Sequence, residues 1–493
     1  TLPGYVWGTS TDDNGDMNIK LMADMNADGL GDLVFIQAGG GQDSNVHSND
    51  ESGTAVDRVC TALSTGTKFK TPTCKNILSK TEAREASEIF SFGDLNADGA
   101  SDVISFSKAH KYMSQHGARA LFGKPIDTTH RGNFVSKDGW EFGAEKLVSK
   151  SKQGVYKHWW EDLTKKGTGQ KYRCSNDSGY TYCKNEAPRE IRDVNGDGLP
   201  DMVVFGLTNV FVALNDRNNP GKFLDLSSWL GNSHWRKETA PTFNTGGWNK
   251  DYPRMMCDID GDGLPDIVGF GHAGTQVFWN SGHSFASKDS GKRNGQYISD
   301  FGWSQGWRND SHKRTCADVN GDGLGDIVGF GASKTIIYVS TGTGFTQWKS
   351  LDSFGANKWN LGTEPRGVQD LNGDGLADIF GFEREGDREG RIIARMATGN
   401  GFDRAIRISA NLGNEKVVGD YKNPRFLRDV NGDGCPDFVT YSSDKARVYI
   451  NKTCDMKRGI GADLMVSIHD GHSVGSGLAH SEKRKYGIRI NYG

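Results

Sequence analysis

The chain has 493 residues, of which 66 are glycine, 35% are hydrophobic and 25% are charged, with a formal net charge of −3. This composition is typical of a globular protein rich in turns and favours β structure. The longest apolar runs, such as 202–205, have the length of a strand, whereas a membrane helix needs roughly 18 residues. We therefore expect no membrane span, and nucleic acid is not an expected partner. The chain begins at Thr1 without a charged and apolar leader, which favours a mature form.

A nine-residue motif, D-x-[ND]-x-D-G-x-x-D, recurs along the chain. Its seven copies begin at Asp24, Asp94, Asp193, Asp258, Asp318, Asp370 and Asp429. Successive starts lie 52 to 99 residues apart, so a unit of about 50 to 70 residues repeats with one large insertion. A repeat of this size is typical of a propeller blade.

An apolar run of β type follows each motif and predicts a buried strand. These runs are 33–36, 103–106, 202–205, 267–270, 327–330, 379–382 and 438–441. A further strand is expected in several units, at 276–279, 335–339 and 446–450. Six units then place a glycine shortly before a phenylalanine, at Phe69, Phe134, Phe223, Phe285, Phe345 and Phe402. Each unit therefore reads as four strands with the motif loop after the first.

A four-stranded antiparallel sheet cannot bury both faces alone, so seven such sheets are expected to pack radially. The sequence predicts an all-β fold, a seven-bladed β-propeller with one calcium loop per blade, formed by residues 1–493 as a single domain. Two surface insertions are expected, at about 39–57 and 107–187. The tail 455–493 is expected to close or decorate the last blade, which either a piece of 464–468 or the N-terminal segment 5–7 would complete.

The motif has the pattern of a calcium loop. Oxygen-bearing side chains stand at positions 1, 3, 5 and 9, the position-7 carbonyl adds a ligand, and glycine at position 6 permits a sharp turn. A flexible loop with several carboxylates suits calcium better than magnesium. About seven calcium ions are therefore expected. The candidate ligands are Asp24, Asn26, Asp28, Leu30, Asp32; Asp94, Asn96, Asp98, Ala100, Asp102; Asp193, Asn195, Asp197, Leu199, Asp201; Asp258, Asp260, Asp262, Leu264, Asp266; Asp318, Asn320, Asp322, Leu324, Asp326; Asp370, Asn372, Asp374, Leu376, Asp378; and Asp429, Asn431, Asp433, Cys435, Asp437.

Two other interpretations of the motif were weighed. An EF-hand needs a glutamate at position 12, where Phe35 and Val204 stand, and it needs a helix rather than a strand after the loop. The second alternative is a metal-free hairpin turn, which would not require carboxylates at positions 1, 5 and 9 together. A structural ion that neutralises the crowded charges is the simplest role for calcium here.

The loops also conceal a charge imbalance. Setting aside their 22 aspartates leaves 40 acidic residues against 59 lysines and arginines. Seven bound calcium ions would raise the formal net charge from −3 to +11. Such a surface favours anionic partners such as acidic polysaccharides, although ordinary solvated lysines explain it equally well.

Cysteine usage favours an oxidising compartment and hence a secreted, extracellular protein. Three local pairs among the eight cysteines are candidate disulfides: Cys60 with Cys74, Cys174 with Cys183, and Cys435 with Cys454. Cys257 and Cys316 stand just before matching motifs, where they either bridge neighbouring units or, as we prefer, remain buried thiols. Sequons at Asn176, Asn309 and Asn451 agree with secretion and glycosylation.

The loop and strand at 262–271, with its near copy ending at Gly331, resemble FG-GAP/VCBS-type repeats. Among these, the chain is most similar to the Psathyrella velutina lectin family, and the segment 301–308 strengthens the resemblance. The resemblance covers residues 188 to 450 well, and the first two units mainly through their loops. It implies a seven-bladed, calcium-binding propeller that holds N-acetylglucosamine between blades.

Sugars stack on aromatic rings and bind polar side chains, so tryptophans between strands are candidate binding residues. The carbohydrate-binding candidates are Trp248, Trp303, Trp307, Arg308 and Trp359, with Trp307 and Arg308 as the clearest pair. Each tryptophan could instead pack between blades as core. The recurring arginines Arg189, Arg254, Arg314, Arg366 and Arg425 could bind ligand or brace each calcium loop.

The preferred function is a non-catalytic, multivalent lectin that binds glycans or acidic polysaccharides. An extracellular structural or adhesive subunit, bound to other proteins through the tail 469–492, is the alternative. A polysaccharide lyase is the third reading, because a base and a cation suffice for that chemistry. Its candidate residues lie in the insertion: His158, Trp159, Trp160, Tyr172, Tyr180 and Tyr182. No nucleophile elbow, zinc motif or phosphate loop is present in the sequence.

Overall fold

The computed structural model describes residues 19–37, 58–76, 89–106, 118–123, 146–147, 165–166, 170–171, 189–205, 210–224, 227–230, 253–286, 288–289, 293–294, 297–309, 311–357, 359, 366–383, 391–408, 425–441, 446–454 and 467–470. Within these ranges, no helix has the length and apolarity to cross a membrane. The expected all-β class is confirmed: the elements of the described residues are strands, together with one short 3-10 turn, η2 (Trp303–Gln305).

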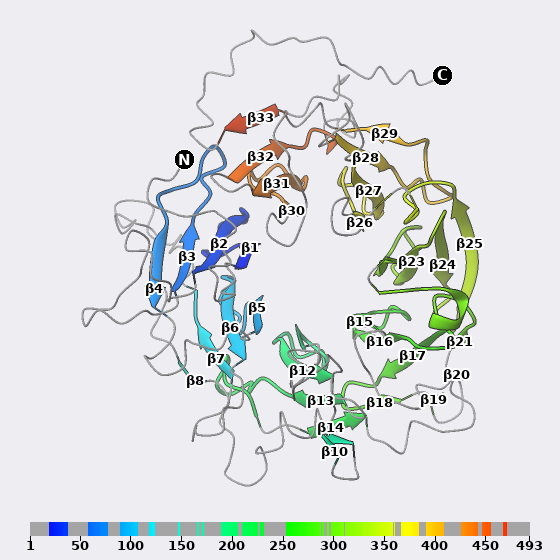
Figure 1. Cartoon of the computed structure of the whole chain (residues 1–493). Coiled ribbons are helices and arrows are strands. Elements are labelled where there is room, and N and C mark those ends of the chain that lie inside the picture. Colours follow the sequence, from blue (N-terminus) through cyan, green and yellow to red (C-terminus); the bar gives the residue numbers. More distant parts are fainter. Residues whose placement is uncertain are drawn as a thin grey trace.

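Seven antiparallel sheets, six of four strands and one of five, follow one another around a ring (Figure 1), and we number them one to seven in chain order. Their first strands are β1 (Ile19–Ala23), β5 (Ile89–Gly93), β11 (Arg189–Arg192), β15 (Arg254–Cys257), β22 (Arg314–Ala317), β26 (Arg366–Gln369) and β30 (Arg425–Arg428). The second strands are β2 (Asp32–Gln37), β6 (Asp102–Phe106), β12 (Asp201–Phe205), β16 (Asp266–Phe270), β23 (Asp326–Phe330), β27 (Asp378–Glu383) and β31 (Asp437–Tyr441). The third strands are β3 (Arg58–Ala62), β7 (Ala118–Leu121), β13 (Val210–Ala213), β17 (Thr275–Asn280), β24 (Thr335–Ser340), β28 (Arg391–Arg395) and β32 (Ala446–Ile450). The fourth strands are β4 (Thr73–Asn76), β8 (Lys146–Leu147), β14 (Ser227–Leu230), β18 (Phe285–Ala286), β25 (Phe345–Leu351), β29 (Ile406–Arg407) and β33 (Ser467–Asp470).

The strands predicted after each motif are confirmed as the seven second strands. Each begins at the ninth motif residue, and the further strands expected at 276–279, 335–339 and 446–450 are third strands. Two small hairpins lie outside the four-strand pattern, β9 (Lys165–Lys166) with β10 (Gln170–Lys171), and β19 (Lys288–Asp289) with β20 (Arg293–Asn294). In the fourth sheet, β21 (Tyr297–Ile298) pairs with β17 beyond β18. Together β18 and β21 occupy the edge that the single strand β25 covers in the fifth sheet.

Two expectations about the insertions and the tail change with the structure. The region 107–187 is not wholly a surface insertion, because it supplies β7 and β8 of the second sheet. The last sheet is completed by a tail strand, β33, which pairs with β32. The insertion 39–57 and the N-terminal segment 5–7 lie outside the described residues.

The core consists of seven apolar clusters, each formed between two neighbouring sheets. Alternation along the second strands produces this pattern, because successive side chains of a strand point to opposite faces. In β16, Ile267 packs towards the third sheet and Val268 towards the fifth. One cluster joins the two ends of the ring: Met22, Leu33 and Phe35 of the first sheet pack with Val430, Val439 and Val448 of the seventh.

The antiparallel path separates two faces of the molecule. The turn between the first and second strands, which is the motif loop, lies at the same end of each sheet as the turn between the third and fourth strands. The turn between the second and third strands lies at the opposite end, with the connector that leads to the next sheet. We call these ends the loop face and the connector face.

Candidate metal loops and connector face

The motif loops share one backbone conformation, with positive φ at positions 4 and 6. The glycine at position 6 has φ between 82° and 90° in all seven loops. Position 4 is glycine in five loops, but Ala27 and Ala97 take its place in the first two, with φ of 59° and 58°. Glycine adopts this region without steric cost, whereas an alanine there is strained. The loops therefore require their glycines for backbone reasons.

The first aspartate of each loop holds this turn from inside. In the third loop, the carboxylate of Asp193 accepts hydrogen bonds from the N–H groups of Gly196, at 2.7 Å, and Gly198, at 2.8 Å. The N–H of the position-6 glycine donates to the first aspartate in every loop. This carboxylate is thus an ordering group of the turn as well as a candidate ligand.

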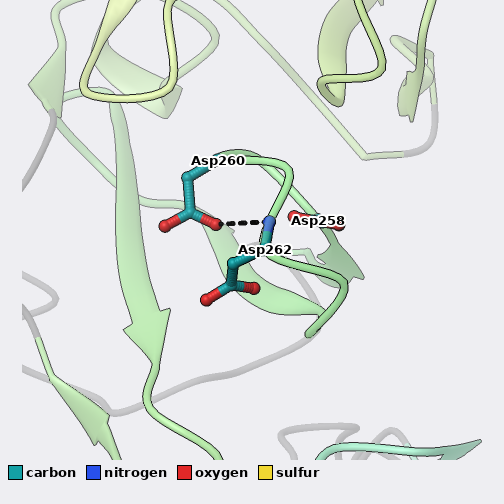
Figure 2. A group of neighbouring side chains, drawn as sticks. All are labelled: Asp258, Asp260 and Asp262. Atoms are coloured by element: carbon teal, nitrogen blue, oxygen red, sulfur yellow. Dashed lines mark hydrogen bonds between the residues drawn. The ribbon is translucent and has the colours of Figure 1, made fainter. Parts of the chain in front are cut away.

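The fourth loop gathers three carboxylates. Six loops carry asparagine at position 3, and its amide donates to the carboxylate at position 5. The fourth loop has Asp260 there instead, so Asp258, Asp260 and Asp262 bring carboxylate oxygens within 4.8 Å of one another (Figure 2). Three such charges repel strongly unless a cation or a proton lies between them. This all-oxygen donor set fits a hard cation such as calcium.

The ninth aspartate is buried in all seven loops and joins the loop to the third strand. In the fourth loop, one oxygen of Asp266 accepts from the N–H of Ile259, and the other accepts from the N–H of Asn280, at the end of β17. Equivalent pairs of bonds recur in the other six loops. Each carboxylate oxygen has two lone pairs, so these bonds leave capacity for a cation.

Burial gives these aspartates unusual protonation equilibria in the metal-free fold. Desolvation raises the carboxyl pKa of Asp32, Asp102 and Asp266 to about 8. It raises the pKa of Asp201, Asp326, Asp378 and Asp437 to about 7. Two negative charges of the same loop raise each of these pKa values further: those at positions 1 and 5 in six loops, and those of Asp260 and Asp262 in the fourth. A bound cation would oppose both effects by favouring the ionised carboxylate.

Neighbouring loops contact one another directly. At four junctions, the N–H of position 8 donates to the position-1 carbonyl of the preceding loop, at 2.7 to 2.8 Å. The donors are Gly31, Ser101, Gly325 and Ala377. The position-7 leucine also reaches the preceding loop, since a Cβ placed on Gly261 would lie 2.8 Å from Leu324 Cδ2. The position-4 glycine therefore provides the space for the next loop's leucine.

The other three junctions lack this backbone bond. Position 8 is proline there, at Pro200, Pro265 and Pro436, and proline has no N–H to donate. In these sheets the residue at the end of the third strand, on its last position or within two residues of it, is asparagine: Asn215, Asn280 and Asn451. The amide of Asn280 donates to Val194 O of the preceding loop, at 2.9 Å, and to Pro265 O, at 3.2 Å. Asn215 and Asn451 make the same pair of bonds.

The sequence alone did not predict that the residue at the end of the third strand joins neighbouring loops. A signal existed, because in four units it stands five residues before the recurring phenylalanine: Ser64, Asn280, Ser340 and Ala397 before Phe69, Phe285, Phe345 and Phe402. The pairing of asparagine here with proline at position 8 becomes meaningful only when the two residues are seen side by side.

On the connector face, the two tryptophans of the segment 299–312 have different environments. Trp307 is only 5% exposed, packs against Phe301 and donates its Nε1–H to Asp300, at 3.1 Å. Trp303 begins the turn η2 and is partly exposed, and the guanidinium of Arg308 lies 3.7 Å from its ring centroid. The pairing of Trp307 with Arg308 is therefore corrected: Arg308 stacks on Trp303, and Trp307 belongs to the core.

Arg308 is held in place by backbone carbonyls. Its Nη1 donates to Trp303 O, at 2.7 Å, and to Trp307 O, at 2.9 Å. The neighbouring Gln305 donates to Ala273 O of the turn between β16 and β17, so η2 rests on that turn. A guanidinium has five N–H donors, so the remaining nitrogens of Arg308 can donate to further acceptors.

The packing of Phe301 with Trp307 is repeated at the next junction. Trp359 is partly exposed and packs against Phe354, which is buried. Both pairs cover a glycine of the following sheet: a Cβ on Gly329 would lie 2.3 Å from Phe301, and one on Gly381 would lie 2.5 Å from Trp359. Glycine in these strands therefore makes room for the aromatic rings.

The recurring arginines lie at the start of the first strands, at the end of the sheet away from the motif loop, so they do not brace the loops. The guanidinium groups of four of them instead lie over phenylalanines of the preceding sheet. The pairs are Arg254 with Phe205, Arg314 with Phe270, Arg366 with Phe330, and Arg425 with Phe382. Arg314 and Arg366 also donate to carbonyls of the aromatic segments, at Phe301 and Trp359.

Two expected disulfides are present, Cys60–Cys74 and Cys435–Cys454. The preferred interpretation of Cys257 and Cys316 as buried thiols is wrong, because the two form a disulfide between β15 and β22 of neighbouring sheets. Radial packing places these strands side by side, and Gly325 allows the bridge, since a Cβ there would lie 2.3 Å from Cys257 Sγ. Cys174 and Cys183 lie outside the described residues.

The sequon at Asn451 is not accessible in this fold. Asn451 is fully buried, and its amide nitrogen is used in hydrogen bonds to Leu371 O and Pro436 O. Asn309 is exposed on the connector face, whereas Asn176 lies outside the described residues. Trp248 and the candidate lyase residues His158, Trp159, Trp160, Tyr172, Tyr180 and Tyr182 also lie outside them.

Residues 318–381, from the fifth motif loop into β27, match the profile of the FG-GAP-like repeat family. The chain carries an FG-GAP-like repeat. No curated protein sequence matches it significantly. Among solved structures, the chain is similar to a lectin of Agrocybe aegerita that recognises non-reducing terminal N-acetylglucosamine, with 23% identity, a TM-score of 0.56, and coverage of 87% of this chain and 86% of that chain. This likeness concerns the fold.

Two other solved structures show weaker similarity to the chain. The Tc holotoxin pore of Photorhabdus luminescens is 16% identical, with a TM-score of 0.40, over 86% of this chain and 16% of that chain. A putative 6-phosphogluconolactonase from Bacteroides uniformis is 10% identical, with a TM-score of 0.36, over 90% of this chain and 95% of that chain. We draw no conclusion from these two.

Proposed function

We propose that this FG-GAP-repeat chain is a secreted, calcium-stabilised propeller that binds carbohydrate on its connector face. In this proposal, residues 1–493 form one domain in which seven sheets close a ring. Glycans, including acidic polysaccharides, are the partners. The disulfides agree with a secreted protein, because such bonds persist in oxidising compartments.

The calcium part of the proposal is supported by the donor set of the loops. Asp258, Asp260 and Asp262 would hold the ion in the fourth loop, with the position-7 carbonyl of Leu264 and the buried Asp266 completing the set. When bound, the ion supplies positive charge that neutralises the crowded carboxylates. Because the loops and the aromatic turns lie at opposite ends of the sheets, calcium would stabilise the fold without contacting the carbohydrate.

The observation that carries the carbohydrate part is the exposed turn η2, which presents the partly exposed indole of Trp303 with the Arg308 guanidinium stacked on it. An indole offers an apolar surface to the C–H face of a sugar, and a fixed guanidinium directs hydroxyl or carboxylate oxygens. The fold likeness to the Agrocybe aegerita lectin supports N-acetylglucosamine-terminated glycans as the first ligands to test. Trp359, in the next connector, is also partly exposed and is the candidate for a second contact with a polymeric glycan.

The test compares binding to immobilised N-acetylglucosamine-terminated glycans with thermal stability, in the presence of calcium. We expect Trp303→Ala and Arg308→Ala each to lower affinity about tenfold, since each loses a contact of roughly 1 to 2 kcal/mol. Their Tm should remain close to that of the wild type, because both side chains are partly exposed.

Trp307→Ala is the matched control, because it removes an indole from the same segment but from the core. It should lower Tm clearly, as expected for the loss of a buried aromatic ring. Unchanged binding by both Trp303 and Arg308 variants would remove this turn from the proposed site. A wild-type protein that binds no glycan on a broad array would refute the carbohydrate function, and release of unsaturated uronates from a polysaccharide would indicate a lyase instead.

A further inference from the structure

The junction between the seventh and first sheets differs from the other six in how it is held. Each sheet consists of strands from one continuous stretch of the chain, and among the described residues no sheet combines strands from both ends of the chain. No connector passes directly from the seventh sheet to the first, because these contain the last and first described strands. No disulfide recorded in the described part of the chain crosses this junction.

The seventh and first loops instead meet through three contacts. The N–H of Gly31 donates to Asp429 O, at 2.7 Å. The side chain of Leu30 occupies the space above Gly432, where a Cβ would lie 3.0 Å from Leu30 Cδ2. The hydroxyl of Ser64 donates to Val430 O, at 2.7 Å. Beneath them lies the apolar cluster that the two sheets share.

The junction between the fourth and fifth sheets provides an internal control. It has the same three contacts: Gly325 N to Asp258 O at 2.8 Å, Leu324 against Gly261, and Ser340 Oγ to Ile259 O. However, the chain also runs directly from one sheet to the next there, and the Cys257–Cys316 disulfide joins them. The two junctions thus share their loop contacts and differ in covalent connection.

On the seventh loop, all three of these contacts are made by residues 429–432: the carbonyl oxygens of Asp429 and Val430, and Gly432. The conformation of this segment is set by Asp429, whose carboxylate accepts from the N–H groups of Gly432 and Gly434. The Cys435–Cys454 disulfide holds the opposite side of the loop, towards the sixth sheet, where Cys454 Sγ would lie 3.3 Å from a Cβ on Gly373. The conformation of residues 429–432, which face the first sheet, therefore depends on the Asp429 carboxylate and on the positive charge that neutralises it.

We propose that calcium in the seventh loop acts as the clasp of the ring, holding residues 429–432 in the shape that receives Gly31, Leu30 and Ser64 of the first sheet. This inference rests on the calcium binding proposed above. Loss of the ion removes its positive charge from between the carboxylates of Asp429 and Asp433, whose mutual repulsion then distorts the segment. The ring then opens first between the seventh and first sheets, because neither a connector nor a disulfide joins these two sheets in the described part of the chain.

The experiment is hydrogen exchange, read by mass spectrometry on the full chain at a series of free calcium concentrations. We expect peptides covering 19–37 and 425–441 to lose protection at calcium concentrations where peptides covering 254–270 and 314–330 remain protected. Matched variants sharpen the comparison. Ser64→Ala and Leu30→Ala should raise the calcium concentration that protects 425–441 about fivefold, whereas Ser340→Ala and Leu324→Ala should leave it unchanged.

Three outcomes are distinguishable. Early loss of protection at the seventh and first sheets alone supports the clasp. Loss that is uniform around the ring, or that begins at the fourth and fifth sheets, overturns the clasp while leaving calcium binding intact. Absence of calcium binding in titration calorimetry refutes the calcium part of the proposed function, and the clasp with it.

Discussion

At the scale of single residues, hydrogen-bond capacity explains choices that look arbitrary in the sequence. Position 8 of the loop and the residue at the end of the third strand act together. Where position 8 has a backbone N–H, that group donates directly to the preceding loop. Where position 8 is proline, the residue at the end of the third strand is asparagine. Where position 8 is Pro265, the bond to the position-1 carbonyl of the preceding loop is absent, and Asn280 donates instead to two other carbonyls, Val194 O and Pro265 O. A buried carbonyl without a hydrogen bond costs free energy, so the two positions constrain each other.

Asn280→Ala should therefore lower the free energy of unfolding by about 2 kcal/mol, because two carbonyls lose their donor. Denaturant unfolding in excess calcium measures this. Asn219→Ala, which removes an exposed asparagine, is the control and should change stability by less than about 0.5 kcal/mol. Equal effects of the two variants would contradict the role assigned to Asn280. Pro265→Gly combined with Asn280→Ser, which copies the fifth sheet, should recover part of the loss.

At the scale of the element, the motif loop is both a turn and a candidate ion site, and its ninth residue connects these roles. The buried carboxylate ties the loop to the third strand through two backbone N–H groups, so that loop and sheet form together. The cost is desolvation of seven carboxylates, which raises their pKa to about 7 or 8 in the metal-free fold.

This predicts an unusual pH dependence for the calcium-free protein. Between about pH 5 and pH 8, the folded state retains protons on these carboxyls that the unfolded chain, with pKa values near 4, has already released. The folded state therefore binds more protons, and stability falls as the pH rises through this window. Calorimetry in chelator should show a declining Tm from about pH 5 to pH 8, and saturating calcium should remove most of the slope. A Tm that rises with pH in chelator would contradict the raised pKa values.

At the scale of the whole molecule, the seven sheets are joined by seven apolar clusters and by a continuous series of loop contacts. At four junctions the position-7 leucine of one loop fills the space at position 4 of the preceding loop, and one of these is the contact of Leu30 with Gly432 between the first and seventh sheets. The stability of each junction is thus linked to the shape of the loops on both sides. The aromatic segments brace the opposite face with Phe301 and Phe354.

Removal of calcium should therefore destabilise the entire molecule. An ion at 100 times its Kd contributes about 2.7 kcal/mol per site, and with several sites we expect Tm to fall by about 10 °C or more in excess chelator. Calorimetry with and without chelator measures the change. Magnesium at the same concentration should restore little of the loss, because it requires a tighter octahedron. An unchanged Tm would remove calcium from its structural role.

The sequence by itself determined the repeat, the strand after each motif and the number of sheets. These features are local, since a nine-residue pattern followed by an apolar run fixes a turn and a strand within a few residues. Two of the described disulfides, Cys60–Cys74 and Cys435–Cys454, were also predictable because their partners are close in sequence. The aspartates of the loops could be selected as candidate ligands because they belong to the same nine-residue pattern.

Only the tertiary structure decided what lies between the sheets. Cys257 and Cys316 are 59 residues apart, and their pairing follows from the radial packing of β15 against β22. The burial of Trp307, the exposure of Trp303 and the stacking of Arg308 depend on how a connector folds over the next sheet. The arginines face preceding phenylalanines rather than loops, because antiparallel strands carry them to the opposite end. Such contacts join units distant along the chain, and no local pattern specifies which residues will meet across a junction.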